Sequence, residues 1–141
     1  MTRIMILVST AIALAFASAA TGADNATRFD GTWDTTLSCS NSTGALGYSF
    51  QFPSTVKDGV LHGQKGDEGK PGWLQLDGNI QPDGTAKLYA KGLVGAKEYA
   101  VGHRPAGSEY GYHIEGTFSE KEGSGKRVEG RPCEVNFARK Q

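Results

Sequence analysis

Apolar and polar residues alternate through short segments along nearly the whole chain from residue 29 onward. A period of two is typical of β-strands that bury one face. Most of the 20 glycines fall between these segments, where the turns of an antiparallel sheet would lie. Beyond the N-terminal region, no stretch carries a helical repeat of useful length. The pattern therefore predicts an all-β domain of about eight or nine short antiparallel strands.

Two turns give the clearest local predictions. Asp58-Gly59, between two valines, offers the positive-φ residues that a type I′ hairpin turn requires. Residues 73–81 and 85–91 alternate on either side of Pro82-Asp83-Gly84 and form the strongest predicted hairpin. The strands expected elsewhere are 33–39, 48–52, a short 99–101, 110–118, 126–130 and 133–139, with polar loops at 103–107 and 119–125.

The only two cysteines, Cys39 and Cys133, lie in phase with the apolar residues of the first and last predicted strands. Closing the sheet into a barrel makes these strands neighbours, which brings the two thiols within reach of each other. We therefore expect a Cys39–Cys133 disulfide in a single antiparallel up-and-down β-barrel of about eight strands. A β-sandwich is the alternative architecture.

The N-terminal residues have the order of a secretory signal peptide. Arg3 precedes an apolar run at 4–16, and small residues follow at Ala17-Ser18-Ala19. The run is too short to span a bilayer. We expect 1–19 to be a signal peptide, 20–28 a flexible N-terminal segment and 29–141 the β-barrel domain. An exported protein is periplasmic or extracellular, and there two thiols are normally paired.

Charge narrows the possible partners. Removal of 1–19 leaves 122 residues (141 minus 19), with 14 Lys and Arg (15 minus Arg3) against 15 Asp and Glu, a net charge of −1. This balance excludes recruitment of nucleic acid by bulk electrostatics. No further apolar run is long enough for membrane insertion. We expect a monomer without a cofactor.

The first predicted strand opens with Phe29-Asp30-Gly31-Thr32-Trp33, which resembles the Gly-x-Trp start of lipocalins and avidin-type barrels, the calycin-like folds. The resemblance implies that Trp33 closes one end of the barrel and packs against an Arg near the chain end, Arg139 or Arg131. The chain also resembles small secreted alphaproteobacterial proteins of unknown function, which implies no activity. It shares with them the order Gly-Thr-Trp, Asp-Gly-Val-Leu, Gly-Trp-Leu, Pro-Asp-Gly-Thr-Ala and Glu-Gly-Arg-Pro-Cys. It is shorter than lipocalins and lacks their later motifs, which argues against a deep ligand cup.

Aromatic side chains are abundant at predicted inward positions. A barrel of about eight strands is either filled by its own side chains or open to one small ligand. Rings bury about 150 to 250 Å² each, enough in sum to fill a short barrel, so we expect a packed interior. The rings concerned are Trp33, Tyr48, Phe50, Phe52, Tyr110, Tyr112, Phe118 and Phe137.

Motifs for catalysis or metal binding are weak. The glycine-rich segment 63–72 has the wrong spacing for a phosphate loop, and Pro71 stands where Ser or Thr would hold magnesium. The three histidines, His62, His103 and His113, have no spacing suited to zinc, so we expect no metal site. No nucleophile motif of the Gly-x-Ser-x-Gly type is present.

The candidate binding residues are Trp73, His103 and Arg104, which lie beside the two longest irregular segments. Trp73 is out of phase with the next two leucines, which favours an outward ring, although packing under the loop is the alternative. Loops on a rigid barrel are common binding sites. We expect a non-enzymatic exported protein that binds a small molecule, a glycan or a protein at a loop end. If the rim does not bind, the site should lie inside the barrel among Tyr48, Phe50, Tyr110 and Tyr112.

Two alternatives remain for function. One is a small exported hydrolase or isomerase in which the His103-Arg104 loop works with Glu109 or Tyr110 as an acid–base group at the barrel mouth. The other is a purely structural envelope protein.

Overall fold

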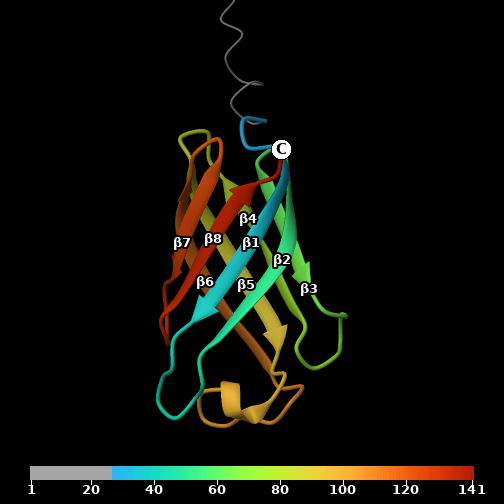
Figure 1. Cartoon of the computed structure of the whole chain (residues 1–141), viewed down its shortest axis with the longest axis vertical. Helices are drawn as coiled ribbons and strands as arrows, with labels where there is room; N and C mark the ends of the chain where they lie inside the picture. The colour runs from blue at the N-terminus through green and yellow to red at the C-terminus, as the bar shows by residue number, and fades with distance from the viewer. Residues whose placement is uncertain (1–26) are drawn as a thin grey trace, which may run out of the picture.

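The computed structural model describes residues 27–141, which form a closed antiparallel barrel in which consecutive strands pair and the last strand returns to the first (Figure 1). This confirms the up-and-down barrel and excludes the sandwich. The expected signal peptide and residues 20–26 lie outside the described residues. The strands are β1 (Gly31–Cys39), β2 (Tyr48–Lys57), β3 (Val60–Lys65), β4 (Leu74–Ile80), β5 (Thr85–Leu93), β6 (Glu109–Phe118), β7 (Glu122–Arg127) and β8 (Cys133–Arg139).

The predicted turns and the predicted disulfide are confirmed. Asp58 and Gly59 have φ values of 52° and 76°, as the tight β2–β3 turn requires. Cys39 and Cys133 lie directly opposite each other in the β1–β8 register and are bonded. The disulfide therefore joins the two strands whose pairing closes the barrel.

The predicted strand at 99–101 is wrong. Residues between β5 and β6 form a long connection whose only regular element is the 3₁₀-helix η1 (Lys97–Tyr99). Tyr99 and Val101 are 45% and 43% exposed, so their alternation does not mark a buried face. The period-two signal failed here because two apolar residues are too few to define one.

The expected loop at 119–125 and the expected strand at 126–130 are also wrong, because β7 occupies Glu122–Arg127. Its inward positions include Gly123 and Gly125 rather than large apolar residues. A Cβ atom at Gly123 would lie 2.8 Å from the Phe118 ring, and one at Gly125 would lie 2.9 Å from Ile114 Cγ2. Large neighbours fill the space, so this strand needs glycine and shows no hydrophobic alternation.

One end of the barrel is closed by the segment that leads into β1. Phe29 and Trp33 are fully buried there, and Trp33 Nε1 donates to the Phe29 carbonyl at 3.0 Å. The Arg139 guanidinium lies 5.5 Å from the Trp33 ring. Arg139 thus takes the position that the Gly-x-Trp resemblance implies, whereas Arg131 lies at the opposite end.

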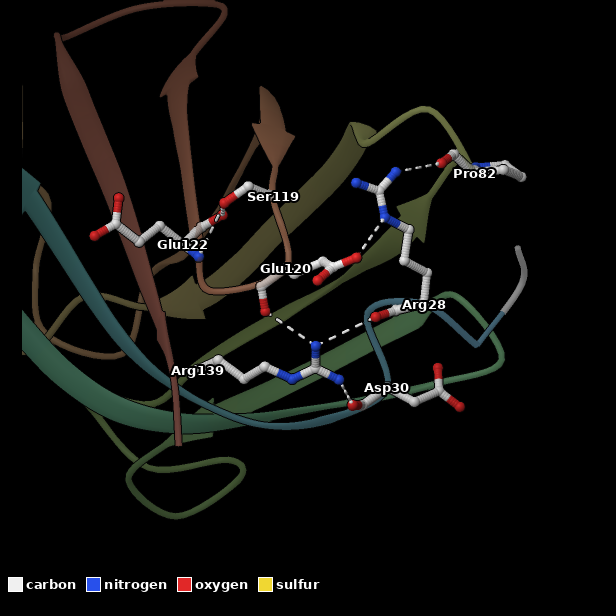
Figure 2. Close-up of polar contacts among 7 residues, drawn as sticks. All are labelled: Arg28, Asp30, Pro82, Ser119, Glu120, Glu122 and Arg139. Carbon is white, nitrogen blue, oxygen red and sulfur yellow. Dashed lines mark hydrogen bonds and ion pairs between the residues drawn. The ribbon is translucent and has the colours of Figure 1, made fainter. Parts of the chain in front are cut away.

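Hydrogen bonds from Arg139 hold the closing segment in place (Figure 2). Its guanidinium donates to the carbonyls of Arg28 at 3.2 Å, Glu120 at 3.0 Å and Asp30. Arg28 in turn donates to the Pro82 carbonyl at 3.3 Å and pairs with the Glu120 carboxylate at 3.6 Å. The segment that leads into β1, the β4–β5 turn and the β6–β7 turn are therefore joined at the closed end.

The core is densest toward this end. The Phe118 ring contacts Trp33 and Phe137, with centroid distances of 5.2 and 4.8 Å. Toward the other end, three inward rings are only partly buried, those of Tyr48, Phe50 and Tyr110. The interior is therefore filled at one end and lined, but not filled, at the other.

Candidate ligand-binding cavity

The longer strand connections meet at the end opposite the closing segment, which we call the open end (Figure 1). The β5–β6 connection crosses this end with η1 and is bonded to its neighbours. Leu46 N in the β1–β2 connection donates to the Glu98 carbonyl at 2.8 Å, and Gly72 N donates to the Leu93 carbonyl at 3.0 Å. These bonds fix the loops around the mouth.

A cavity of about 610 Å³ opens at this end. The expectation that aromatic rings fill the whole barrel is therefore wrong. Tyr48 and Phe50 of β2 form one wall, and Tyr110 and Tyr112 of β6 form another. The remaining lining residues are Gly47, Ser49, Lys65, Gly72, Leu93, Val94, Gly95, Ala96, Tyr99, Ala100, Val101, Arg104, Arg127 and Arg131.

The Arg131 side chain is hydrogen-bonded to two of the strand connections around the cavity mouth. It is only 7% exposed, and its guanidinium donates to the carbonyls of Tyr99 at 2.7 Å, Ser40 at 2.5 Å and Leu46 at 3.0 Å. The same group lies 5.2 Å from the Tyr48 ring centroid. Its Nε–H is buried without a hydrogen-bond partner among residues 27–141. Arg131 therefore holds the β1–β2 and β5–β6 connections in place.

Two further cations cover ring faces in the cavity. The Arg127 guanidinium lies 4.0 Å from the Tyr112 ring centroid, and Lys65 Nζ lies 4.0 Å from the Phe50 centroid. Arg127 Nε also donates to the Glu129 carbonyl. A cation above an aromatic face is attracted to the negative face of the ring, so these contacts orient both side chains.

Three of the phenols that line the cavity remain protonated at neutral pH. Burial raises the pKa of Tyr48, Tyr110 and Tyr112 above the usual 10.0, because the charged phenolate is poorly solvated there. Nearby Arg131 and Arg127 oppose this effect at Tyr48 without reversing it. The Tyr48 and Tyr112 hydroxyls also interact with each other, which lowers the pKa of Tyr48 and raises that of Tyr112.

The outward orientation expected for Trp73 is wrong. The residue is 8% exposed and is absent from the cavity lining, and Lys91 Nζ lies 5.8 Å from the centroid of its ring. Trp73 precedes β4, and its backbone bonds to Lys70 and Leu93 place it at the end of a turn rather than in the strand. Strand alternation therefore does not apply to it.

The other two candidate residues, Arg104 and His103, differ in whether they line the cavity. Arg104 lines the cavity mouth, and its guanidinium donates to the Glu109 carbonyl at 2.5 Å. His103 lies outside the lining, with Nε2 at 3.2 Å from the Gly44 carbonyl. The contact that Arg104 makes to Glu109 uses the backbone and not the carboxylate, so it forms no acid–base pair.

The side chains of His62 and His113 are both exposed. Within residues 27–141, no group of three His, Cys, Asp or Glu side chains could hold a metal ion. No helix in this part of the chain is long and apolar enough to cross a membrane.

Sequence reasoning missed the cationic character of the cavity. The signal for Arg127 was present, because it follows inward Gly123 and Gly125 at a spacing of two. This spacing identifies Arg127 as an inward residue only if the bounds of β7 are already known. Arg131 lies outside any strand, and its burial depends on three loops that only the tertiary structure brings together.

The chain matches no protein family model, and comparison with curated proteins and with solved structures finds no significant match for it. Its function is therefore argued from the cavity.

Proposed function

We propose that this chain is an exported, non-enzymatic binding protein, periplasmic or extracellular, that holds one small molecule in the open-end cavity. The observation that carries the proposal is the cavity itself, at about 610 Å³. Ligand sites commonly have volumes of about 300 to 1,000 Å³, apolar walls and a few placed polar groups. The proposed binding site lies among the interior rings rather than on the loop rim expected from the sequence, and Arg104 lies at its mouth.

The construction of the barrel supports this role. The closed end supplies the packed core, and the open end has loops fixed by hydrogen bonds around partly exposed rings. Such a site is largely formed before a ligand arrives, which lowers the entropic penalty of binding. The order of residues in 1–19 and the buried disulfide support export to an oxidising compartment.

Titration with the neutral dye phenylnaphthylamine, which fluoresces in apolar surroundings, tests the proposal. We expect one bound dye per chain. Phe50→Ala removes an apolar wall of the cavity and should weaken binding about tenfold. Tyr89→Ala is the matched control, because it removes a 43% exposed ring from the outer face of β5 and should leave the affinity unchanged.

Two results would contradict cavity binding. One is that the dye does not bind to folded protein at all. The other is that the Phe50 and Tyr89 variants lose affinity equally, which would place the dye on the barrel exterior.

A further inference from the structure

Positive charge gathers around the open-end cavity without matching negative charge. Four basic side chains line it, Lys65, Arg104, Arg127 and Arg131, and none of the lining residues is Asp or Glu. They come from β3, the β5–β6 connection, β7 and the β7–β8 connection, so the cluster is a property of the fold rather than of one basic segment.

None of these four cations forms an ion pair with a carboxylate within residues 27–141. The carboxylate closest to Arg127 in sequence, that of Glu129, accepts hydrogen bonds from the His113 backbone N–H at 2.6 Å and its ring Nδ1 at 3.0 Å. The charge of Arg127 helps to lower the pKa of Glu129, so this carboxylate offsets part of that charge. With four basic and no acidic residues in the lining, the cavity wall keeps a net positive charge.

Donors of the cluster give a second indication. Within residues 27–141, the Arg127 guanidinium donates from Nε to the Glu129 carbonyl and weakly from one terminal nitrogen to Cys133 Sγ at 4.0 Å, and its other terminal nitrogen has no partner. Arg127 lines the cavity. An anionic oxygen accepts from arginine more strongly than a neutral oxygen does.

The rest of the lining is apolar. Phe50, Val94, Ala100 and Val101 present carbon surface, and the Tyr110 and Tyr112 rings stack at 6.2 Å with an interplanar angle of 10°. A purely polar anion would leave this surface uncovered, and a neutral oil would leave the donors and cations unpaired. The two parts of the lining fit the two parts of an amphipathic anion.

Building on the proposed function, we infer that the cavity selects organic anions. The ligand is a small molecule with a carboxylate or sulfonate group on an apolar body. The anionic group lies near the Arg127 guanidinium, and the apolar body lies against Phe50 and the β5–β6 connection.

Two dyes with the same body test the inference. Anilinonaphthalenesulfonate carries a sulfonate, and phenylnaphthylamine is the same aromatic amine without it. We expect the sulfonate dye to bind at least about tenfold more tightly than the neutral dye. Raising the salt concentration from about 50 to 500 mM should weaken the binding of the anion and not that of the neutral dye.

Variants test whether the basic side chains cause the tighter binding of the sulfonate dye. Arg127→Gln should weaken binding of the sulfonate dye about tenfold and that of the neutral dye less than about twofold. Lys126→Gln is the matched control, because it removes the same charge from an adjacent, exposed position of β7 and should change neither affinity. Arg104→Gln, at the exposed mouth, should weaken only the sulfonate dye, by about twofold to threefold.

The outcomes separate the two proposals. If the neutral dye binds in the cavity as tightly as the sulfonate dye, or if Arg127→Gln weakens both equally, selection of anions is wrong while cavity binding stands. If neither dye binds, both proposals fail. Melting temperatures of the variants, measured without dye, verify that a loss of affinity is not a loss of folding.

Discussion

Removing the Cys39–Cys133 disulfide should destabilise the protein mainly through its unfolded state. The two residues already face each other in the β1–β8 register, so the folded barrel needs little rearrangement when both become alanine. The bond closes a loop with a sequence separation of 94 residues, most of the described chain. Without it, the unfolded chain gains the conformational freedom of that loop.

The magnitude follows from the length of the loop. For the 94-residue separation, the chain-entropy model gives a loss of about 16 cal/mol/K, or about 4.7 kcal/mol at about 25 °C. Folded domains are typically stable by only about 5 to 15 kcal/mol. The double variant Cys39→Ala/Cys133→Ala should therefore lose about a third to nearly all of the original stability, and its unfolding midpoint should move to a lower urea concentration.

Urea denaturation followed by tryptophan fluorescence measures this loss. We expect the slope of the free energy against urea to rise in the double variant, because an unfolded chain without the crosslink exposes more surface. Ser38→Ala/Glu134→Ala is the matched control, since these residues form the neighbouring exposed pair of the same register and should change stability by less than about 0.5 kcal/mol. A loss below about 1 kcal/mol with an unchanged slope would refute the loop-closure argument.

Two further predictions concern buried aromatic side chains. Trp73→Ala should lower stability by about 3 kcal/mol, since the ring is buried, and a loss under about 1 kcal/mol would place it at the surface. The free energy of unfolding should be at its full value below about pH 10 and fall above it. Burial raises the pKa of Tyr110 and Tyr112 in the folded protein, whereas in the unfolded chain both phenols ionise near their usual pKa. Ionisation above that pKa therefore favours the unfolded state. Urea midpoints across that range measure the fall, and a Tyr110→Phe/Tyr112→Phe variant with an equally steep fall would contradict this cause.

The parts of the fold that local chemistry determines were predictable from the sequence. Alternation placed Trp33, Leu37 and Cys39 on one face of β1, and all three are buried. Asp58-Gly59 predicted a turn because few other residues tolerate its backbone angles. In-phase cysteines in the first and last strands predicted both the disulfide and the closure of the sheet.

The errors occurred where a residue's environment depends on distant elements. The sequence of β7 shows no hydrophobic alternation, because Phe118 and Ile114 occupy the space that large inward side chains of β7 would fill. Trp73 is buried although it lies at the end of a turn, where the sequence has no periodic signal. The cavity could not be foreseen by summing ring areas, because that sum ignores where along the barrel axis each ring lies.

The placement of charge explains why one end of the barrel is packed and the other is hollow. At the closed end, Arg139 donates to three backbone carbonyls outside the core, so the Trp33, Phe118 and Phe137 rings can meet across the axis. At the open end, Arg127 and Lys65 lie over the inner faces of rings. Arg139 also lies over a ring, that of Trp33, but its guanidinium is satisfied by three carbonyls. Covering Arg127 and Lys65 with further carbon would remove the water that solvates them, so the space beyond them stays open. The packed aromatic core and the cavity thus lie at opposite ends of the same strands.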